Sequence, residues 1–144
     1  MAISQAMATS FKVGILNGTF DFSATTSQTF YIALYTNAAT LGATTTTYTT
    51  VDEITGTGYI AGGKLLAISQ VPTSTGTTAF LDFTDITWPT ASFTARGALI
   101  YLNNAGTNPA VAVLNFGADK TATSGDFTIV FPAADASNAI IRIA

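Results

Sequence analysis

The stretch Asp126-Phe127-Thr128-Ile129-Val130-Phe131 places a large aromatic or aliphatic side chain on every second residue, at Phe127, Ile129 and Phe131. A period of two is typical of a β-strand that buries one face. Residues 30–35, which read Phe-Tyr-Ile-Ala-Leu-Tyr, show the same alternation. We therefore expect β-strands over residues 126–131 and 30–35.

Further segments of strand composition follow at short spacing, with turn-forming residues between them. The expected strands cover residues 64–71, 77–83, 91–102, 109–116 and 139–143. The expected turns lie at residues 72–76, 88–89, 103–108, 117–125 and 132–138. Many short strands in this arrangement predict an all-β fold, specifically a jelly-roll-like antiparallel β-sandwich. Because the sequence shows neither an internal repeat nor a linker, we expect one domain over residues 1–144.

The first segment of the chain is the candidate for a helix. Four large apolar side chains recur there every four residues, at Ile3, Met7, Phe11 and Ile15. This spacing places them on one face of a helix, and Asn17-Gly18 follows as a strong signal for its end. We expect one N-terminal helix over about residues 3–16, packed on the sheet through Met7, Phe11 and Ile15. The alternative is an arm that docks on a neighbouring subunit.

Two long segments between the early strands lack a clear strand pattern. Residues 36–50 are rich in Thr and Ala and are too long for a hairpin turn. Loops of this length in compact domains are usually functional or mobile. Residues 52–63 hold four glycines around Tyr59 and Ile60, which predicts a glycine-hinged loop with one short strand.

The composition is poor in charge. Of the 144 residues, 48% are hydrophobic and 9% are charged, whereas a soluble chain carries about 25% charged residues. Threonine, with 27 residues, takes their place. A neutral hydroxyl costs less to bury than an ion, so this surface suits a protein that packs against neighbours.

Charge and residue usage also argue against several classes of protein. The net charge is −3 and the five cations are scattered, whereas nucleic-acid binding needs a clustered basic face. The sequence holds no run of about 18 apolar residues, so we expect no membrane-spanning helix. Its first residues lack the pattern of a signal peptide, which predicts synthesis in a cytoplasm. The lack of cysteine excludes disulfides, and the lack of histidine removes the commonest base and metal ligand.

The acidic residues are the remaining candidates for catalysis. Asp82 and Asp85 flank the end of an expected strand, and Asp119 and Asp126 flank an expected turn. A glycosidase uses two carboxylates about 5–9 Å apart, so either pair is formally possible. Aspartates at such positions more commonly cap turns. We therefore expect no catalytic residue, and an enzyme is the least favoured hypothesis.

Three features could bind a ligand, and each has a plainer interpretation. Residues 119–126 offer two carboxylates for calcium but carry Lys120 between them. Residues 58–64 place a glycine before a lysine as in a phosphate-binding loop, yet Leu65 stands where Ser or Thr is required. Four aromatic residues could form a sugar-binding platform, although such rings more often belong to a core: Tyr59, Trp88, Phe93 and Tyr101. We expect no cofactor and no metal.

Four segments carry a resemblance to a known family. They are residues 11–18, residues 95–102 (Ala-Arg-Gly-Ala-Leu-Ile-Tyr-Leu), residues 110–117 (Ala-Val-Ala-Val-Leu-Asn-Phe-Gly) and residues 125–143. Together they resemble the capsid decoration, or cement, proteins of tailed bacteriophages. The resemblance spans most of the chain and implies a jelly-roll-like protein that binds the major capsid protein and other copies of itself. Such proteins have no active site, so the resemblance assigns no site residue.

The expected function is therefore structural. We expect a homo-oligomeric virion protein on the outer surface of the capsid, made in the host cytoplasm, with neither nucleic acid nor membrane as a partner. The alternative is a carbohydrate-binding or receptor-binding module of a phage tail or head fibre. The first hypothesis predicts apolar patches that become covered on assembly, and the second predicts a concave aromatic site.

Overall fold

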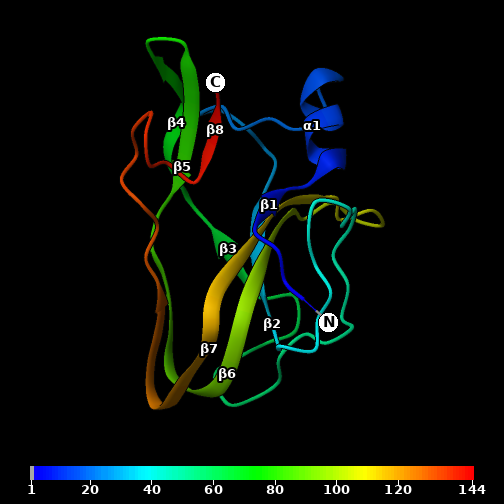
Figure 1. The fold of residues 1–144 in the computed structure, drawn as a ribbon, viewed down its shortest axis with the longest axis vertical. Helices are drawn as coiled ribbons and strands as arrows, with labels where there is room; N and C mark the ends of the chain where they lie inside the picture. Colours follow the sequence, from blue (N-terminus) through cyan, green and yellow to red (C-terminus); the bar gives the residue numbers. More distant parts are fainter. Residues whose placement is uncertain (1) are drawn as a thin grey trace.

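The computed structural model describes residues 2–144, and most of the regular structure in them is β-strand (Figure 1). In chain order the elements are β1 (Ala6–Met7), α1 (Thr9–Leu16), β2 (Phe30–Tyr35), β3 (Lys64–Leu66), β4 (Ile68–Thr75), β5 (Thr78–Phe83), β6 (Ile86–Leu102), β7 (Ala110–Ile129) and β8 (Ile141–Ile143). The expected all-β class with one N-terminal helix is confirmed.

The strands form two antiparallel sheets. The larger sheet has the strand order β1-β7-β6-β2-β3, and the smaller has the order β4-β5-β8. Buried residues from both sheets belong to one hydrophobic core. The molecule is thus a β-sandwich in which the two sheets share their interior.

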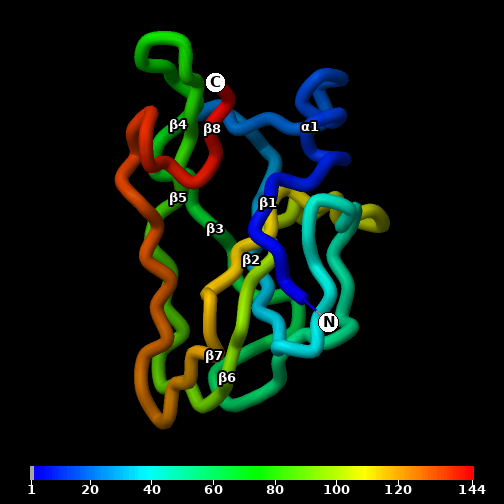
Figure 2. Tube along the Cα trace, viewed as in Figure 1, coloured from blue at the N-terminus to red at the C-terminus, as the bar shows by residue number. Residues whose placement is uncertain are grey.

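The long strands β6 and β7 lie side by side and bend together at one end of the molecule (Figure 2). Their pairing shifts register between Trp88 and Ala91, which is where a β-bulge bends a strand. Thr90 and Ser124 have φ angles of 52° and 48°, in the left-handed region that L-residues seldom adopt. These residues form the corner of the bent hairpin.

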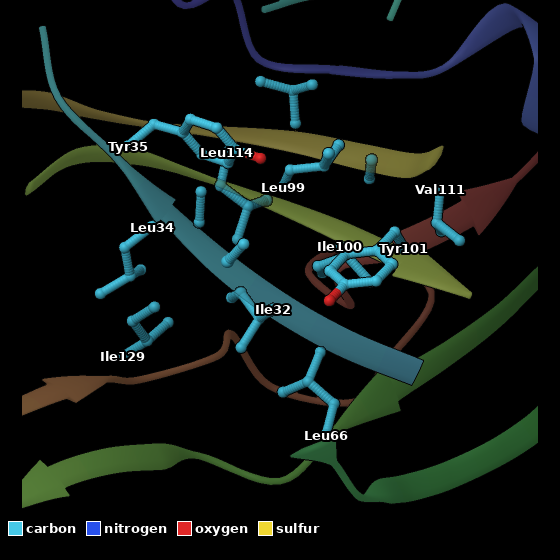
Figure 3. Packing of buried hydrophobic residues seen from close by; sticks show 14 of the residues in the cluster. Ile32, Leu34, Tyr35, Leu66, Leu99, Ile100, Tyr101, Val111, Leu114 and Ile129 are labelled. Atoms are coloured by element: carbon cyan, nitrogen blue, oxygen red, sulfur yellow. The ribbon is translucent and has the colours of Figure 1, made fainter. Parts of the chain in front are cut away.

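The strand β2 runs through the centre of the core. Five of its six residues are buried, so both of its faces are covered. Figure 3 shows Ile32 and Leu34 of β2 among apolar side chains that include Leu66 of β3 and Ile129 of β7. The alternation predicted over residues 30–35 is therefore a strand with the expected bounds, but one buried on both sides.

The N-terminal helix is shorter than the expected 3–16. It begins at Thr9 because the preceding residues are extended: Ala6 and Met7 pair with β7, and the N–H of Ala8 donates to the carbonyl of Val111 at 2.9 Å. Sheet pairing gives these backbone groups the partners that they need when buried. The apolar residues whose spacing predicted a longer helix are therefore divided between the extended N-terminal segment and α1.

The expected end and anchor of the helix are partly correct. The helix stops at Leu16, just before Gly18, whose φ of 77° suits a glycine after a helix end. Phe11 is fully buried and Ile15 is half-buried, as expected for the packed face. Met7 contributes from β1 rather than from the helix. No helix of the described chain is long and apolar enough to cross a membrane.

Two of the five expected turns are wrong, and the one expected at residues 72–76 is reduced to the link between β4, which ends at Thr75, and β5, which begins at Thr78. Pro72 lies inside β4, which is an edge strand, so its missing N–H leaves no pairing position empty. Pro89 lies inside β6 beside a bulge, and residues 117–125 lie inside β7 opposite β6. The expected turns at residues 103–108 and 132–138 do lie between strands.

The segments between β2 and β5 differ from expectation in two details. Residues 36–63 make isolated bridges rather than named strands, so the short strand expected near Tyr59 is absent from this described segment. The strand expected over 64–71 is divided at Ala67 into β3 and β4, which belong to different sheets.

Candidate functional site

The pair Asp82 and Asp85 serves the backbone. Asp82 Oδ1 accepts a hydrogen bond from the N–H of Phe83 at 2.8 Å, and Asp85 Oδ1 accepts one from the N–H of Phe131 at 2.8 Å. Burial raises the pKa of the Asp82 carboxyl, and the neighbouring Asp85 and Asp135 carboxylates act in the same direction. Asp82 is buried, which leaves a saccharide no access to it.

The pair Asp119 and Asp126 lies on the exposed side of β7. The carboxylate of Asp119 is 3.6 Å from the guanidinium of Arg96 and accepts a hydrogen bond from Asn37 at 3.1 Å. Residues 119–126 lie within β7, which pairs with β6 and bends at Ser124, so they do not wrap around an ion. Among residues 2–144, no group of three acidic side chains is placed to hold a metal.

The aromatic residues considered as a sugar platform lie mostly in the core. Trp88 is 1% exposed and packs edge-on against Phe93 and Phe127, with ring centroids 6.4 and 6.1 Å apart. Tyr101 is 3% exposed, and Tyr59 is half-buried. A sugar ring stacks on an open aromatic face, whereas the faces of these rings are covered by other aromatic side chains.

The lysine considered for phosphate binding is also engaged. The ammonium of Lys64 donates to the carbonyl of Thr87 and lies 5.7 Å from the centroid of the Trp88 ring. It stabilises the junction between β3 and the start of β6.

A hydrogen-bonded cluster that sequence analysis missed ties down the long loops. We call it the Glu53 cluster: Glu53, Tyr48, Tyr59, Gly62 and Tyr101. The Glu53 carboxylate accepts from the hydroxyls of Tyr48 and Tyr59, at 2.7 and 2.6 Å, and from the N–H of Gly62 at 2.7 Å. The Tyr101 hydroxyl donates to the carbonyl of Gly62 at 2.7 Å, which joins the cluster to β6.

The tyrosine hydroxyls of the Glu53 cluster have raised pKa values and so stay protonated. Burial raises the pKa of Tyr101 to about 12, and the charge of Glu53 acts in the same direction. Burial also raises the pKa of Tyr48 and of Tyr59, as does the hydrogen bond of each to Glu53. At neutral pH these hydroxyls are therefore donors rather than nucleophiles, and the cluster is an anchor for residues 48–62.

A groove with mainly apolar walls lies between α1, residues 20–24 and the small sheet. This apolar groove has a volume of about 480 Å³, which lies within the range of about 300–1,000 Å³ for ligand pockets. Its walls are mainly aromatic and aliphatic and include Ile15, Phe20, Val71, Leu81, Ile141 and Ile143. Asp21 is the one charged residue among those that line it.

The wall on the helix side depends on a glycine. A Cβ on Gly14 would lie 2.3 Å from Cε2 of Phe20, so only glycine lets this ring pack against α1. Phe20 also meets Phe11 edge-on, with ring centroids 4.8 Å apart. The alternation of Phe20 and Phe22 on either side of Asp21 was a signal in the sequence for this wall.

Large apolar side chains are also exposed elsewhere on the surface. The most exposed are Leu16 at 89%, Ile60 at 79%, Val130 at 72% and Val51 at 68%. They belong to α1, to the long loops and to the segment after β7.

Comparison of the chain with protein-family models, with curated proteins and with solved structures gave no match.

Proposed function

We propose that this chain is a structural protein that decorates or cements the outer surface of a bacteriophage capsid by binding the major capsid protein. The observation that carries the proposal is the set of large apolar side chains that stand more than half exposed on a weakly charged surface. Single exposed apolar residues are ordinary. Here they accompany an apolar groove, and exposed apolar surface of this kind is what association with another protein would cover.

The resemblance of residues 95–102, 110–117 and 125–143 to decoration proteins supplies the identity of the partner. Residues 95–102 form the second half of β6 and residues 110–117 the first half of β7, whereas residues 125–143 cover the end of β7, the loop after it and β8. Three of the aspartates considered for catalysis also support a structural role. Asp82 and Asp85 accept hydrogen bonds from the backbone, and Asp119 forms an ion pair.

The alternative, a carbohydrate-binding or receptor-binding module of a fibre, has less support. It needs aromatic faces open to a ligand, and Trp88, Phe93 and Tyr101 are buried. An array of glycans, tested with the purified protein, addresses this alternative directly.

The test of the proposal is binding to phage heads that lack the protein, followed by mass spectrometry of purified virions. We expect the protein to co-sediment with the heads and to stay bound when the salt concentration is raised, because apolar burial is not screened by ions. We expect at least one of Val51→Asp, Ile60→Asp and Val130→Asp to release it. Thr75→Asp, on the exposed end of β4, is the matched control. Absence from purified virions, together with no binding to heads, would overturn the proposal.

A further inference from the structure

A short surface turn, Asn17-Gly18-Thr19, follows helix α1, which stands at one end of the molecule (Figure 1). Asn17 has φ −102° and ψ 4°, and Gly18 has a φ of 77°. All three residues are exposed. A Cβ placed on Gly18 would have no heavy atom within 4 Å, so open space surrounds the turn. The proposed function makes no use of this turn, but its sequence is chemically reactive.

An asparagine that precedes a glycine can lose its side-chain amide without an enzyme. The backbone nitrogen of the glycine forms a bond to Cγ of the asparagine, the bond from Cγ to Nδ2 breaks, and Nδ2 leaves as ammonia with the proton of the attacking nitrogen. The product is a cyclic imide. Water then adds to one of the two imide carbonyls and opens the ring, which gives aspartate or isoaspartate. Glycine favours this attack because it has no side chain to hinder its nitrogen.

Asn17 is the asparagine of this chain that meets these requirements. The sequence has seven asparagines, and six of them precede a residue that carries a side chain. Asn108 precedes Pro109, whose nitrogen has no proton to lose. Three others also hold the leaving nitrogen in a hydrogen bond: Asn37, Asn115 and Asn138. Within residues 2–144, Nδ2 of Asn17 makes no such bond, so ammonia can leave from it unhindered.

The folded turn holds the two reacting atoms apart. A ψ of 4° at Asn17 places the Gly18 nitrogen beside the backbone nitrogen of Asn17, whereas ring closure needs it beside Cβ. The Gly18 N–H also donates to the carbonyl of Ile15 at 3.3 Å. Attack therefore requires rotation of the backbone at Asn17 and opening of the turn.

Thr19 restrains this rotation from both its side chain and its backbone. Its hydroxyl donates to Oδ1 of Asn17 at 2.5 Å, and its N–H donates to the carbonyl of Gly14 at 2.8 Å and to the same Oδ1 at 3.2 Å. These bonds tie the Asn17 side chain to the residue after the attacking nitrogen. They must break before Cγ and that nitrogen can meet.

We propose that Asn17 is a site of spontaneous deamidation and that Thr19 slows the reaction by holding the turn closed. The products differ from the parent where α1 ends. Each carries a new carboxylate at the C-terminus of a helix, where the helix dipole disfavours negative charge. Isoaspartate also adds a carbon atom to the main chain between α1 and Phe20, whose ring packs on Gly14. Deamidation therefore loosens the α1 wall of the apolar groove, whether or not the chain binds a capsid.

The first test is incubation of the purified full chain at neutral and mildly alkaline pH, followed by peptide mapping with mass spectrometry. We expect conversion of amide to acid at Asn17 before any other asparagine, with both aspartate and isoaspartate as products. The reaction should be faster at the higher pH, because the attacking nitrogen must lose its proton. Reaction at another asparagine while Asn17 stays intact would overturn the proposal.

The second test measures the restraint by Thr19. Thr19→Val keeps the shape of the side chain but removes its hydroxyl, and we expect deamidation of the folded protein to become about fivefold faster, the effect of losing one hydrogen bond that opposes opening. Thr9→Val, at the exposed start of the same helix, is the matched control and should react at the parent rate. Circular dichroism checks that each variant is folded.

Incubation in concentrated urea separates the restraint from an effect of local sequence. The unfolded chain has no turn for Thr19 to hold, so the parent and Thr19→Val should deamidate there at the same rate. Equal rates in the folded proteins would overturn the role of Thr19. So would a difference between the two proteins that persists unchanged in urea.

The third test concerns the consequence for α1. Anion exchange separates the isoaspartate form from the parent, and we expect it to have a lower midpoint of urea unfolding. Asn17→Asp is the matched control, because it carries the new charge without the additional main-chain carbon, and its midpoint should lie between the two. An isoaspartate form that unfolds at the same urea concentration as the parent would show that the turn does not position α1.

Discussion

At the scale of single residues, Asp82 is 1% exposed and its two carboxylate oxygens have different surroundings. Oδ1 accepts a hydrogen bond from Phe83, whereas Oδ2 is buried and has no hydrogen-bond partner among the described residues. Burial without a partner disfavours the charged form of a carboxyl group. The pKa of Asp82 is raised for this reason, and the nearby Asp85 and Asp135 raise it further.

A raised pKa in the folded state makes stability depend on pH. The folded chain binds the Asp82 proton more tightly than the unfolded chain, whose aspartates have a pKa of about 3.9. The contribution is therefore fully present below that pH and is lost as the pH rises through the folded pKa. Asp82→Asn is neutral throughout, so we expect its stability relative to the parent to increase as the pH rises from 3 to 8. Urea unfolding between pH 3 and pH 8 measures the difference.

The matched control for this prediction is Asp126→Asn. Asp126 is exposed on β7, and surface substitutions usually change stability by less than about 0.5 kcal/mol. Its stability should therefore follow the parent at every pH. A profile for Asp82→Asn that also runs parallel to the parent would show that the buried carboxyl costs nothing.

At the scale of elements, α1 depends on tertiary contacts. It has eight residues, and no side chain caps its N-terminus, whereas isolated helices shorter than about 12 residues are marginal in water. Phe11 holds it in place through edge contacts with Phe20 and Phe22, at centroid distances of 4.8 and 6.0 Å. The stability of α1 therefore depends on the packing of the Phe11 ring.

Phe11→Ala is expected to destabilise the protein by about 3–5 kcal/mol, because it removes a fully buried ring and leaves a cavity. The loss should appear as a lower midpoint of urea unfolding. Val13→Ala on the outer face of the same helix is the control, with an expected change below about 0.5 kcal/mol. Equal stability of Phe11→Ala and the parent would mean that α1 is an arm that packs on a neighbour.

The elements differ in how well the sequence predicts them. The bounds of β2 were predictable because Phe30–Tyr35 is a dense run of strand-forming residues between polar segments. The continuity of β6 and β7 was not, because Pro89 and the segment 117–125 are ordinary turn signals. They become strand only when a partner strand is present and a bulge absorbs the misfit. The turn-forming character of single residues does not show whether a partner strand is present.

The candidate site was less predictable than the fold. The apolar groove forms where α1 and residues 20–24 pack beside the small sheet. Its lining residues are far apart in the sequence, by up to 132 positions from Phe11 to Ile143. In the Glu53 cluster, Tyr48 and Tyr59 donate to Glu53 and Tyr101 donates to Gly62, and residue spacing alone does not reveal these partners. Aromatic residues in loops were the available clue, since a buried hydroxyl usually needs a hydrogen-bond partner.

At the scale of the whole molecule, the aromatic rings form two large groups and a smaller one of Tyr31, Tyr48 and Tyr101. Ring contacts link one group near α1 and the small sheet: Phe11, Phe20, Phe22, Phe30, Phe83 and Phe131. Other contacts link a second group on the bent hairpin and the long loop: Tyr59, Trp88, Phe93, Phe116 and Phe127. The aliphatic residues of β2 and its neighbours, shown in Figure 3, are buried in the same core as both groups.

This shared core decides whether the two groups unfold separately. The paired strands β6 and β7 extend through both regions, from the bend to the pairing of Ala112 with Met7 beside α1. Loss of either aromatic group would therefore expose apolar surface that the other needs to bury. Single domains below about 150 residues usually unfold in one cooperative transition, and we expect the same of this chain.

Trp88 makes the expectation measurable, because it is the sole tryptophan and belongs to the second group. Its fluorescence reports the hairpin, whereas far-ultraviolet circular dichroism reports both sheets, and the two urea midpoints should coincide in the parent. Phe11→Ala removes a ring of the first group, so in a cooperative molecule it should lower the Trp88 midpoint as much as the dichroism midpoint. A Trp88 midpoint that stays in place while the dichroism midpoint falls would mean that the hairpin and the α1 end are separate folding units. The shared interior would then be too weak to couple the two sheets.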